Sequence, residues 1–184
     1  MIKPNFEVMA SYNALMNKRI CDSISTTSEN ILWENKKAFF GSILGTLNHL
    51  MVGDLIWLNR LNHHPSYPTG FKALELLKDF PLPTKLTQIL YDDKQDFSRN
   101  RQALDQIIIR FVEGSDESDY SKNLSYRNTN NDTFNKPFSL LLQHFFNHQT
   151  HHRGQVTTLL FQIDIDIGET DLLMLIPNVD YENL

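Results

Sequence analysis

Cysteine is nearly absent from this sequence, since its 184 residues include only Cys21. One thiol can form no disulfide within the chain and cannot build a cysteine-based zinc site. Long apolar runs are also missing, because none approaches the roughly 20 residues that a membrane-spanning helix needs. Residues 1–5 lack the apolar core of a signal peptide. These absences predict a cytoplasmic protein that does not insert into a membrane.

Clustered positive charge is the next feature that the sequence lacks. The 17 Lys and Arg residues are outnumbered by 22 Asp and Glu residues, which gives a formal net charge of −5. Neutralising phosphates takes grouped Lys and Arg side chains, so we expect no nucleic acid as a partner. Repeats and low-complexity segments are absent too. The length and the 41% of apolar residues fit one domain that spans residues 1–184.

Apolar residues at helical spacing indicate four long helices. We predict them at about residues 6–24, 35–61, 85–113 and 137–163, with Thr84 as the N-cap of the third. Shorter helices are predicted around residues 73–78 and 171–176, and a short hairpin within residues 123–132. Four prolines between residues 65 and 83 mark a long crossover loop. The predicted fold class is therefore all-α, a four-helix bundle with a long crossover and a short C-terminal helix.

Histidines are concentrated in the fourth predicted helix, which holds four of the seven. Two of them, His148 and His152, occupy its apolar stripe, where core residues are expected. They are one turn apart, about 6 Å along the axis, and this spacing lets two imidazoles reach one ion. Burying neutral imidazoles costs free energy unless their nitrogens are satisfied, and a metal ion would satisfy them.

A third candidate ligand lies on the second predicted helix. His49 shares a side with Ala38, Ser42 and Gly45, whose small side chains would let another helix approach closely. Three imidazoles from two facing helices leave at least one open position on a metal ion, as in catalytic sites. The pattern therefore favours a divalent metal ion between the second and fourth helices.

The same residues also fit a protein without a metal. His148 and His152 would then be hydrogen-bonded core histidines or would lie on a solvated face, and His49 would be a satisfied buried histidine. His144 could replace one ligand, although it lies about 80° around the helix from His152. His151 points away from the stripe and is expected to lie outside the ligand set.

Other polar residues near these positions also have more than one interpretation. His63 and His64 lie about 21 Å along the second helix from its candidate ligand, so we predict that they form a separate surface turn. Arg153 and Gln155 flank the ligand face, where they either orient ligands and receive substrate or are ordinary surface residues. Asp54 is predicted to be a polar group on the helix surface or in an interface.

Three segments resemble the DinB branch of the DinB/YfiT-type metalloprotein superfamily. Residues 147–155, which read Asn-His-Gln-Thr-His-His-Arg-Gly-Gln, resemble the hallmark near the start of the last bundle helix. Residues 47–50, followed by Trp57, Arg60 and Leu61, resemble the second-helix signature, and residues 124–128 also fit. The resemblance covers nearly the whole chain.

The resemblance implies a four-helix bundle with an up-down-down-up chain order. It also implies a three-histidine site for nickel or zinc, completed by water, with His49, His148 and His152 as the ligands. Dimers are frequent among such proteins. The second predicted helix is apolar on two sides, which places it centrally or at a subunit contact, so a homodimer is expected.

The resemblance is a weaker guide to the reaction, because its members include thiol S-transferases that use low-molecular-weight thiols and mycothiol-dependent isomerases. We predict a metal-dependent thiol S-transferase acting on small electrophiles. A metal-dependent hydrolase and a metal-stabilised binding or structural protein without turnover are the alternatives. A di-iron carboxylate bundle is excluded, since no glutamate is followed three residues later by a histidine. A Cys-His nucleophile is disfavoured, because Cys21 has no neighbouring histidine in the sequence.

Overall fold

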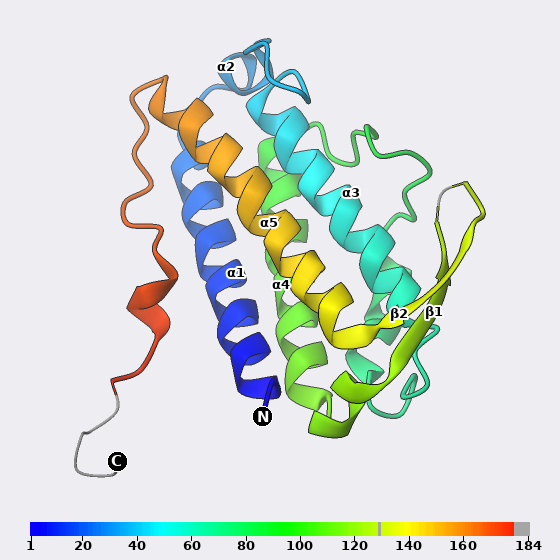
Figure 1. Ribbon diagram of the computed structural model, residues 1–184. Coiled ribbons are helices and arrows are strands. Elements are labelled where there is room, and N and C mark those ends of the chain that lie inside the picture. Colours follow the sequence, from blue (N-terminus) through cyan, green and yellow to red (C-terminus); the bar gives the residue numbers. More distant parts are fainter. Residues whose placement is uncertain (129, 179–184) are drawn as a thin grey trace.

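The computed structural model describes residues 1–128 and 130–178, which are mostly helical (Figure 1). The four long helices are α1 (Lys3–Ser25), α3 (Ile43–Leu61), α4 (Lys94–Gly114) and α5 (Phe138–Phe161). The shorter elements are α2 (Glu29–Trp33), the 3-10 helices η1 (Lys72–Asp79), η2 (Glu117–Ser121) and η3 (Leu172–Leu175), and the antiparallel strands β1 (Asn123–Arg127) and β2 (Thr133–Pro137). The predicted all-α class is confirmed.

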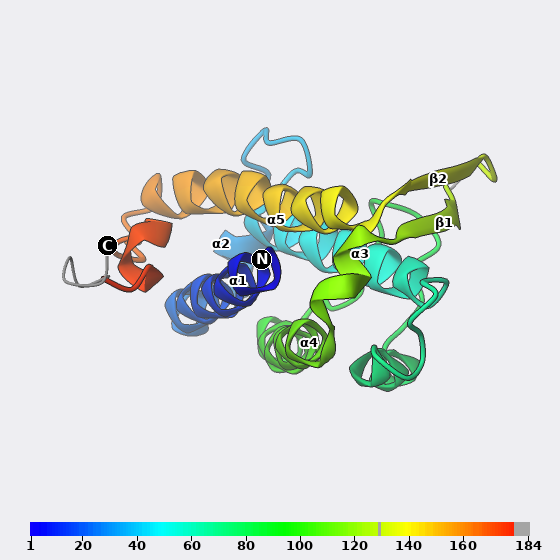
Figure 2. The same cartoon turned by 60° about the horizontal axis from the view of Figure 1, so that its bottom comes forward.

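The long helices follow the up-down-down-up order that the family resemblance implies. Lys94, at the start of α4, donates to the Ser25 carbonyl at the end of α1, and Lys3 donates to the Glu113 carbonyl at the other end. The helices α1 and α4 are therefore antiparallel. The helix α5 returns in the direction of α1 and lies beside both α1 and α3 (Figures 1 and 2). The crossover between α3 and α4 carries η1.

Two predicted helix starts are wrong. The second helix begins at Ile43 rather than near residue 35, because the preceding loop turns through Lys37 and Gly41, which have φ angles of 57° and 78°. Ser42 caps the helix by accepting a hydrogen bond from the Gly45 backbone N–H.

The third helix begins at Lys94, with Asp93 and not Thr84 as its N-cap. The Asp93 carboxylate accepts hydrogen bonds from the backbone N–H groups of the first helical turn. The preceding loop is held by Asn48 instead of forming a helix. The Asn48 side chain accepts from the backbone N–H groups of Leu90 and Tyr91 and donates to the Tyr91 carbonyl.

The helix α3 is the centre of the bundle. All of its residues are buried except Ile56, Trp57, Asn59 and Arg60. Its two apolar sides are thus covered within the chain, by α2 and η1 as well as by the long helices. In the described part of the chain, no helix has the length and apolar character needed to cross a membrane.

Candidate metal centre

Three histidines meet where α3 faces α5. His49 comes from α3, and His148 and His152 come from successive turns of α5. One ring nitrogen of each lies within 4.8 Å of the other two, an arrangement that could hold a metal ion. The ring centroids are 5.3 Å apart for His49 and His148, 4.6 Å for His49 and His152, and 4.5 Å for His148 and His152. The structure therefore brings together all three predicted ligands.

Hydrogen bonds orient two of these rings. His49 Nδ1 lies 3.0 Å from the carbonyl oxygen of Leu86, and His152 Nδ1 lies 2.8 Å from Gln155 Oε1. Both oxygens are acceptors, so each Nδ1 carries the proton and each Nε2 keeps its lone pair. Metal-ligating histidines generally have such oxygen partners on the second nitrogen. The donor set therefore fits a divalent ion.

Burial keeps the three imidazoles neutral. The pKa of His148 is lowered to about 3, mainly by burial and in part by the neighbouring histidines, because two charged rings would repel each other. The pKa values of His49 and His152 are also lowered, in each case mainly by burial. A neutral imidazole is the form that binds a metal, so the cluster has the protonation state of a ligand set.

Gly53 gives His148 the space that it needs. A Cβ atom at Gly53 would lie 2.8 Å from Cε1 of the His148 ring, much closer than carbon atoms normally approach. The sequence pointed instead to Ala38, Ser42 and Gly45 as the small residues at the helix contact. Ala38 lies in the loop before α3, and a Cβ at Gly45 would meet the Phe40 carbonyl rather than α5.

Aromatic and apolar side chains border the three histidines. The Phe40 ring stacks on His49 with centroids 3.7 Å apart and meets His152 edge-on at 5.5 Å. Phe39 packs against Phe40 and is 88% exposed, while Leu86, whose carbonyl holds His49, is 49% exposed. The approach to the site is therefore partly apolar.

The other histidines lie outside the cluster. His144 packs against Trp57 with ring centroids 5.3 Å apart, and His151 is exposed beside Gln155. The predicted surface turn is correct for His63 but wrong for His64, which is 2% exposed. His64 is buried because its ring packs between Phe71 and Phe138, and Phe71 follows in the crossover.

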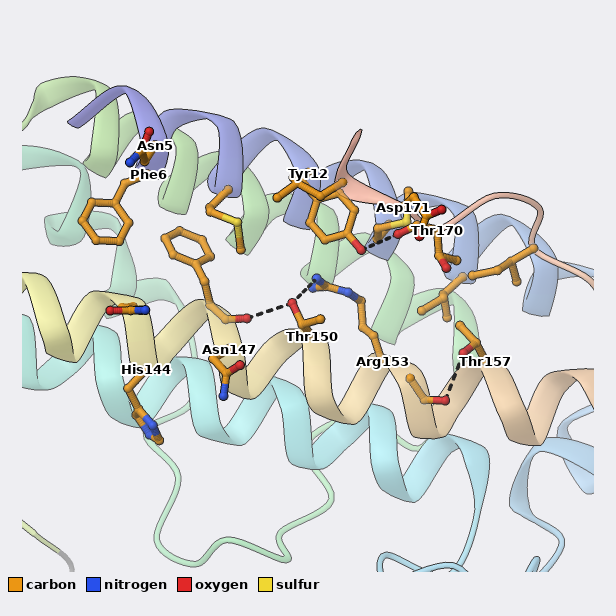
Figure 3. Close-up of a pocket in the computed structure, with 18 of the residues that line it drawn as sticks. Asn5, Phe6, Tyr12, His144, Asn147, Thr150, Arg153, Thr157, Thr170 and Asp171 are labelled. Atoms are coloured by element: carbon orange, nitrogen blue, oxygen red, sulfur yellow. Dashed lines mark hydrogen bonds between the residues drawn. The ribbon is translucent and has the colours of Figure 1, made fainter. Parts of the chain in front are cut away.

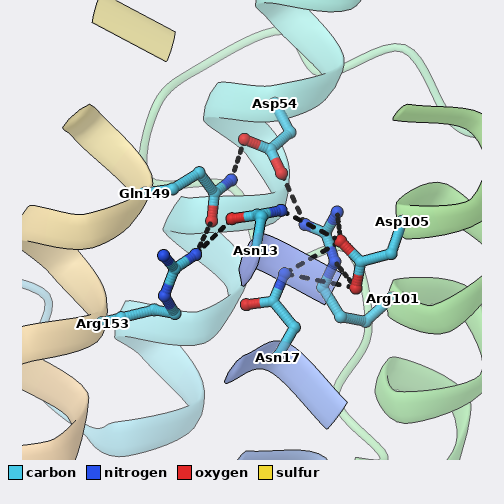
Figure 4. A network of polar contacts seen from close by, with 7 residues as sticks. All are labelled: Asn13, Asn17, Asp54, Arg101, Asp105, Gln149 and Arg153. Atoms are coloured by element: carbon cyan, nitrogen blue, oxygen red, sulfur yellow. Dashed lines mark hydrogen bonds and ion pairs between the residues drawn. The ribbon is translucent and has the colours of Figure 1, made fainter. Parts of the chain in front are cut away.

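Asp54 is also not where the sequence suggested, since it is 1% exposed in the bundle core. It pairs with Arg101 from α4, at 2.6 Å between Oδ2 and Nη1, and accepts a hydrogen bond from Gln149 of α5. Arg101 also pairs with Asp105 (Figure 4). Burial raises the pKa of Asp54 to about 6 even with Arg101 beside it. The i, i+4 pair of Arg101 and Asp105 on an apolar stripe was the sequence signal for this network.

The network reaches all four long helices. Asn13 and Asn17 of α1 donate to Asp105, and Arg153 of α5 donates to Asn13 (Figure 4). Arg153 is therefore a core residue rather than a surface residue on the ligand face, whereas Gln155 does orient His152. Because Asp54 follows Gly53 and Gln149 follows His148, the network joins α3 to α5 directly beside the three histidines.

Four long helices in up-down-down-up order, with three histidines gathered between the second and the fourth, define a class of helical bundles with a candidate metal site. The family model described as DinB family matches residues 1–175, so the chain belongs to the DinB family and the resemblance is confirmed. "Protein DinB" of Bacillus subtilis (strain 168) is 26% identical over 160 residues, which are 87% of this chain and 87% of that protein. No solved structure gives a significant match.

Proposed function

We propose that the protein binds one divalent metal ion, nickel or zinc, through His49, His148 and His152. The observation that carries the proposal is the convergence of three neutral imidazole nitrogens within 4.8 Å. The hydrogen bonds that fix the tautomers of His49 and His152 support it, as does membership of the DinB family.

We further propose that the site catalyses transfer of a low-molecular-weight thiol to a small electrophile. A divalent ion held by three imidazoles has room for another ligand and lowers the pKa of a thiol or water bound to it. Leu86 and Gln155 hold two of the ligand rings in place, while the apolar rim of Phe39 and Phe40 accommodates the body of the electrophile. A carbon–sulfur bond forms as the bond to the leaving group breaks, and the thiol proton passes to solvent.

A metal-stabilised protein without turnover is the second candidate. Its support is that the three histidines tie α3 to α5, so a bound ion stabilises the native bundle whether or not a reaction follows. A metal-dependent hydrolase would use the same site with water as the nucleophile. The three functions differ in whether turnover occurs and whether it needs a thiol.

The test is an assay of the nickel- and zinc-loaded protein with 1-chloro-2,4-dinitrobenzene and a panel of thiols that includes cysteine and glutathione. We expect thiol-dependent release of chloride that is lost in His49→Ala and kept in His63→Ala, which changes an exposed histidine outside the cluster. A metal-dependent rise in melting temperature without turnover for any thiol would favour the second candidate. Turnover of a p-nitrophenyl ester without thiol would favour the hydrolase.

A homodimer of single-domain chains in the cytoplasm remains our proposal for the assembly and its location. The apolar sides of α3 are covered within the chain and give no support to a dimer. The exposed side chains of Phe161 and Leu173, at 71% and 73%, offer apolar surface for a second copy, and the buried thiol of Cys21 suits a reducing compartment. A single 21.4 kDa species in sedimentation would remove the dimer.

A further inference from the structure

A cavity of about 1150 Å³ lies between α1 and α5 (Figure 3). It is lined by one side of each helix and by the segment that leads into η3, and none of the three clustered histidines lines it. The proposed metal chemistry therefore does not account for this cavity. Its walls combine apolar side chains from α1 with polar side chains from α5.

Arg153 forms part of the cavity wall and is 4% exposed. Its Nη1 faces the core network and donates to Asn13 and, across 3.4 Å, to Gln149. Its Nη2 reaches the Thr150 hydroxyl, also at 3.4 Å, and the Tyr12 side chain lies close to the guanidinium, while no hydrogen bond of Nε is formed within the described part of the chain. The edge of the guanidinium that bears Nη2 and Nε is thus poorly satisfied.

The two carboxylates of the core network do not satisfy that edge. Asp54 and Asp105 both pair directly with Arg101, whereas Arg153 forms no ion pair among residues 1–128 and 130–178. A buried guanidinium without a direct carboxylate partner is costly, and a bidentate carboxylate is the partner that best matches its planar fork.

Tyr12 holds the guanidinium in position. The Arg153 guanidinium carbon lies 5.2 Å from the centroid of the Tyr12 ring, and the Tyr12 hydroxyl donates to the Thr170 carbonyl at 2.6 Å. The side chain is therefore ordered before any ligand arrives, which reduces the entropic cost of binding.

The two ends of the cavity differ in chemistry. Asp171 and Thr170 lie beside Tyr12 at one end, while Phe6 lies further along α1 at the other (Figure 3). Met9 and Phe146 line the cavity together with Phe6. The apolar side chains lie towards the Phe6 end, so an apolar tail attached to an anion at Arg153 runs along α1 towards Phe6.

We propose that this cavity binds a medium-chain carboxylate, with its head group on Nη2 and Nε of Arg153 and its apolar tail along Met9 and Phe6. The site is separate from the three histidines and does not depend on the proposed metal function.

Isothermal titration of the full-length protein with octanoate tests the proposal, with octan-1-ol as the ligand that keeps the tail and lacks the charge. We expect saturable binding of octanoate, at least tenfold tighter than that of octan-1-ol, in metal-free and zinc-loaded protein alike. Equal binding of the two ligands, or octanoate binding that appears only with zinc and disappears in His148→Ala, would overturn the proposal. Loss of metal binding in His148→Ala with octanoate binding intact would support a cavity site that is independent of the metal.

Gly154 provides a matched pair of variants, because it lines the cavity and a Cβ there would meet nothing within 4 Å. We expect Gly154→Leu to weaken octanoate binding at least tenfold by filling the space beside Arg153, while Gly154→Ala binds as the wild type does. Arg153→Gln should also lose octanoate binding. Because this substitution also removes the contacts of Arg153 with Asn13 and Gln149 in the core, the Gly154 pair is the cleaner test. Unchanged octanoate binding in Gly154→Leu would refute the assigned location.

Discussion

Gly53 makes the link between helix packing and the metal site testable with one methyl group. The Cβ of Gly53→Ala would lie 2.8 Å from Cε1 of His148. Carbon atoms pack at about 3.5 Å or more, so the ring must move by about 0.7 Å. Metal–ligand distances tolerate about 0.2 Å, and therefore His148 would leave its position in the ligand set. We expect zinc affinity to fall by about 10–100-fold, the range seen when groups that orient ligands are lost.

The assay is a competition titration against a chromophoric zinc chelator, with melting curves of the metal-free proteins recorded in parallel. Gly154→Ala is the matched control, because Gly154 is also helical and a Cβ there meets nothing within 4 Å. Each alanine gains about 1 kcal/mol of helix propensity, so the difference between the variants reports the contact with His148. Zinc binding by Gly53→Ala that equals that of Gly154→Ala would refute the reasoning.

Three further predictions concern the core, the thiol and the pH dependence. Asp54→Ala removes one of the two carboxylates from the buried Arg101. Urea unfolding should show that the free energy of unfolding falls by about 3 kcal/mol, against about 0.5 kcal/mol or less for the variant of an exposed residue, Asp22→Ala. Burial raises the pKa of Cys21 to about 11, so at pH 8 mass spectrometry should detect alkylation by iodoacetamide only when urea is present. The folded pKa of His148, about 3, lies below its ordinary 6.5, so the unfolded chain takes up the proton first as pH falls. The unfolding free energy of the metal-free protein should therefore decline from about pH 6.5 towards pH 3, and His148→Leu should flatten the decline.

Each of these has a clear contrary result. Equal losses for Asp54→Ala and Asp22→Ala would mean that the buried pair does not stabilise the bundle. Alkylation of Cys21 in the native protein would show that the thiol is accessible. An identical pH dependence in His148→Leu would show that this imidazole is not buried in its neutral form.

The long helices and two of the three clustered histidines could be predicted from local pattern alone. Helical periodicity is strong over these lengths, and the spacing of His148 and His152 places both on the stripe that faces α3. His49 required more, because a lone histidine on an apolar helix has no local signature. Its assignment came from the small residues around it and from the family resemblance.

The helix start at Lys94 could not be predicted because a distant contact decides it. The segment before Lys94 has helical periodicity, but the Asn48 side chain takes up its backbone N–H and carbonyl groups and holds it as a loop. This loop supplies the Leu86 carbonyl that orients His49. The helix propensity of this segment is therefore overridden by the tertiary contact with Asn48, which holds the loop that orients His49.

The buried polar residues were missed for a related reason. Asp54, His64 and Arg153 are types that usually lie at the surface, and each is buried only because a partner from another segment satisfies or packs against it. Asp54 needs Arg101 from α4, and His64 needs the two phenylalanine rings that enclose it. A sequence shows the candidates for such pairs but not which of them meet.

Metal content is the measurement that tests the central claim most directly. Untagged wild-type protein, His49→Ala, His148→Ala and the control His63→Ala would be loaded with nickel or zinc, desalted and analysed by mass spectrometry. The account predicts about one equivalent of metal in the wild type and in His63→Ala, and its loss in the other two variants. No retained metal in the wild type, or full retention in both His49→Ala and His148→Ala, would contradict it.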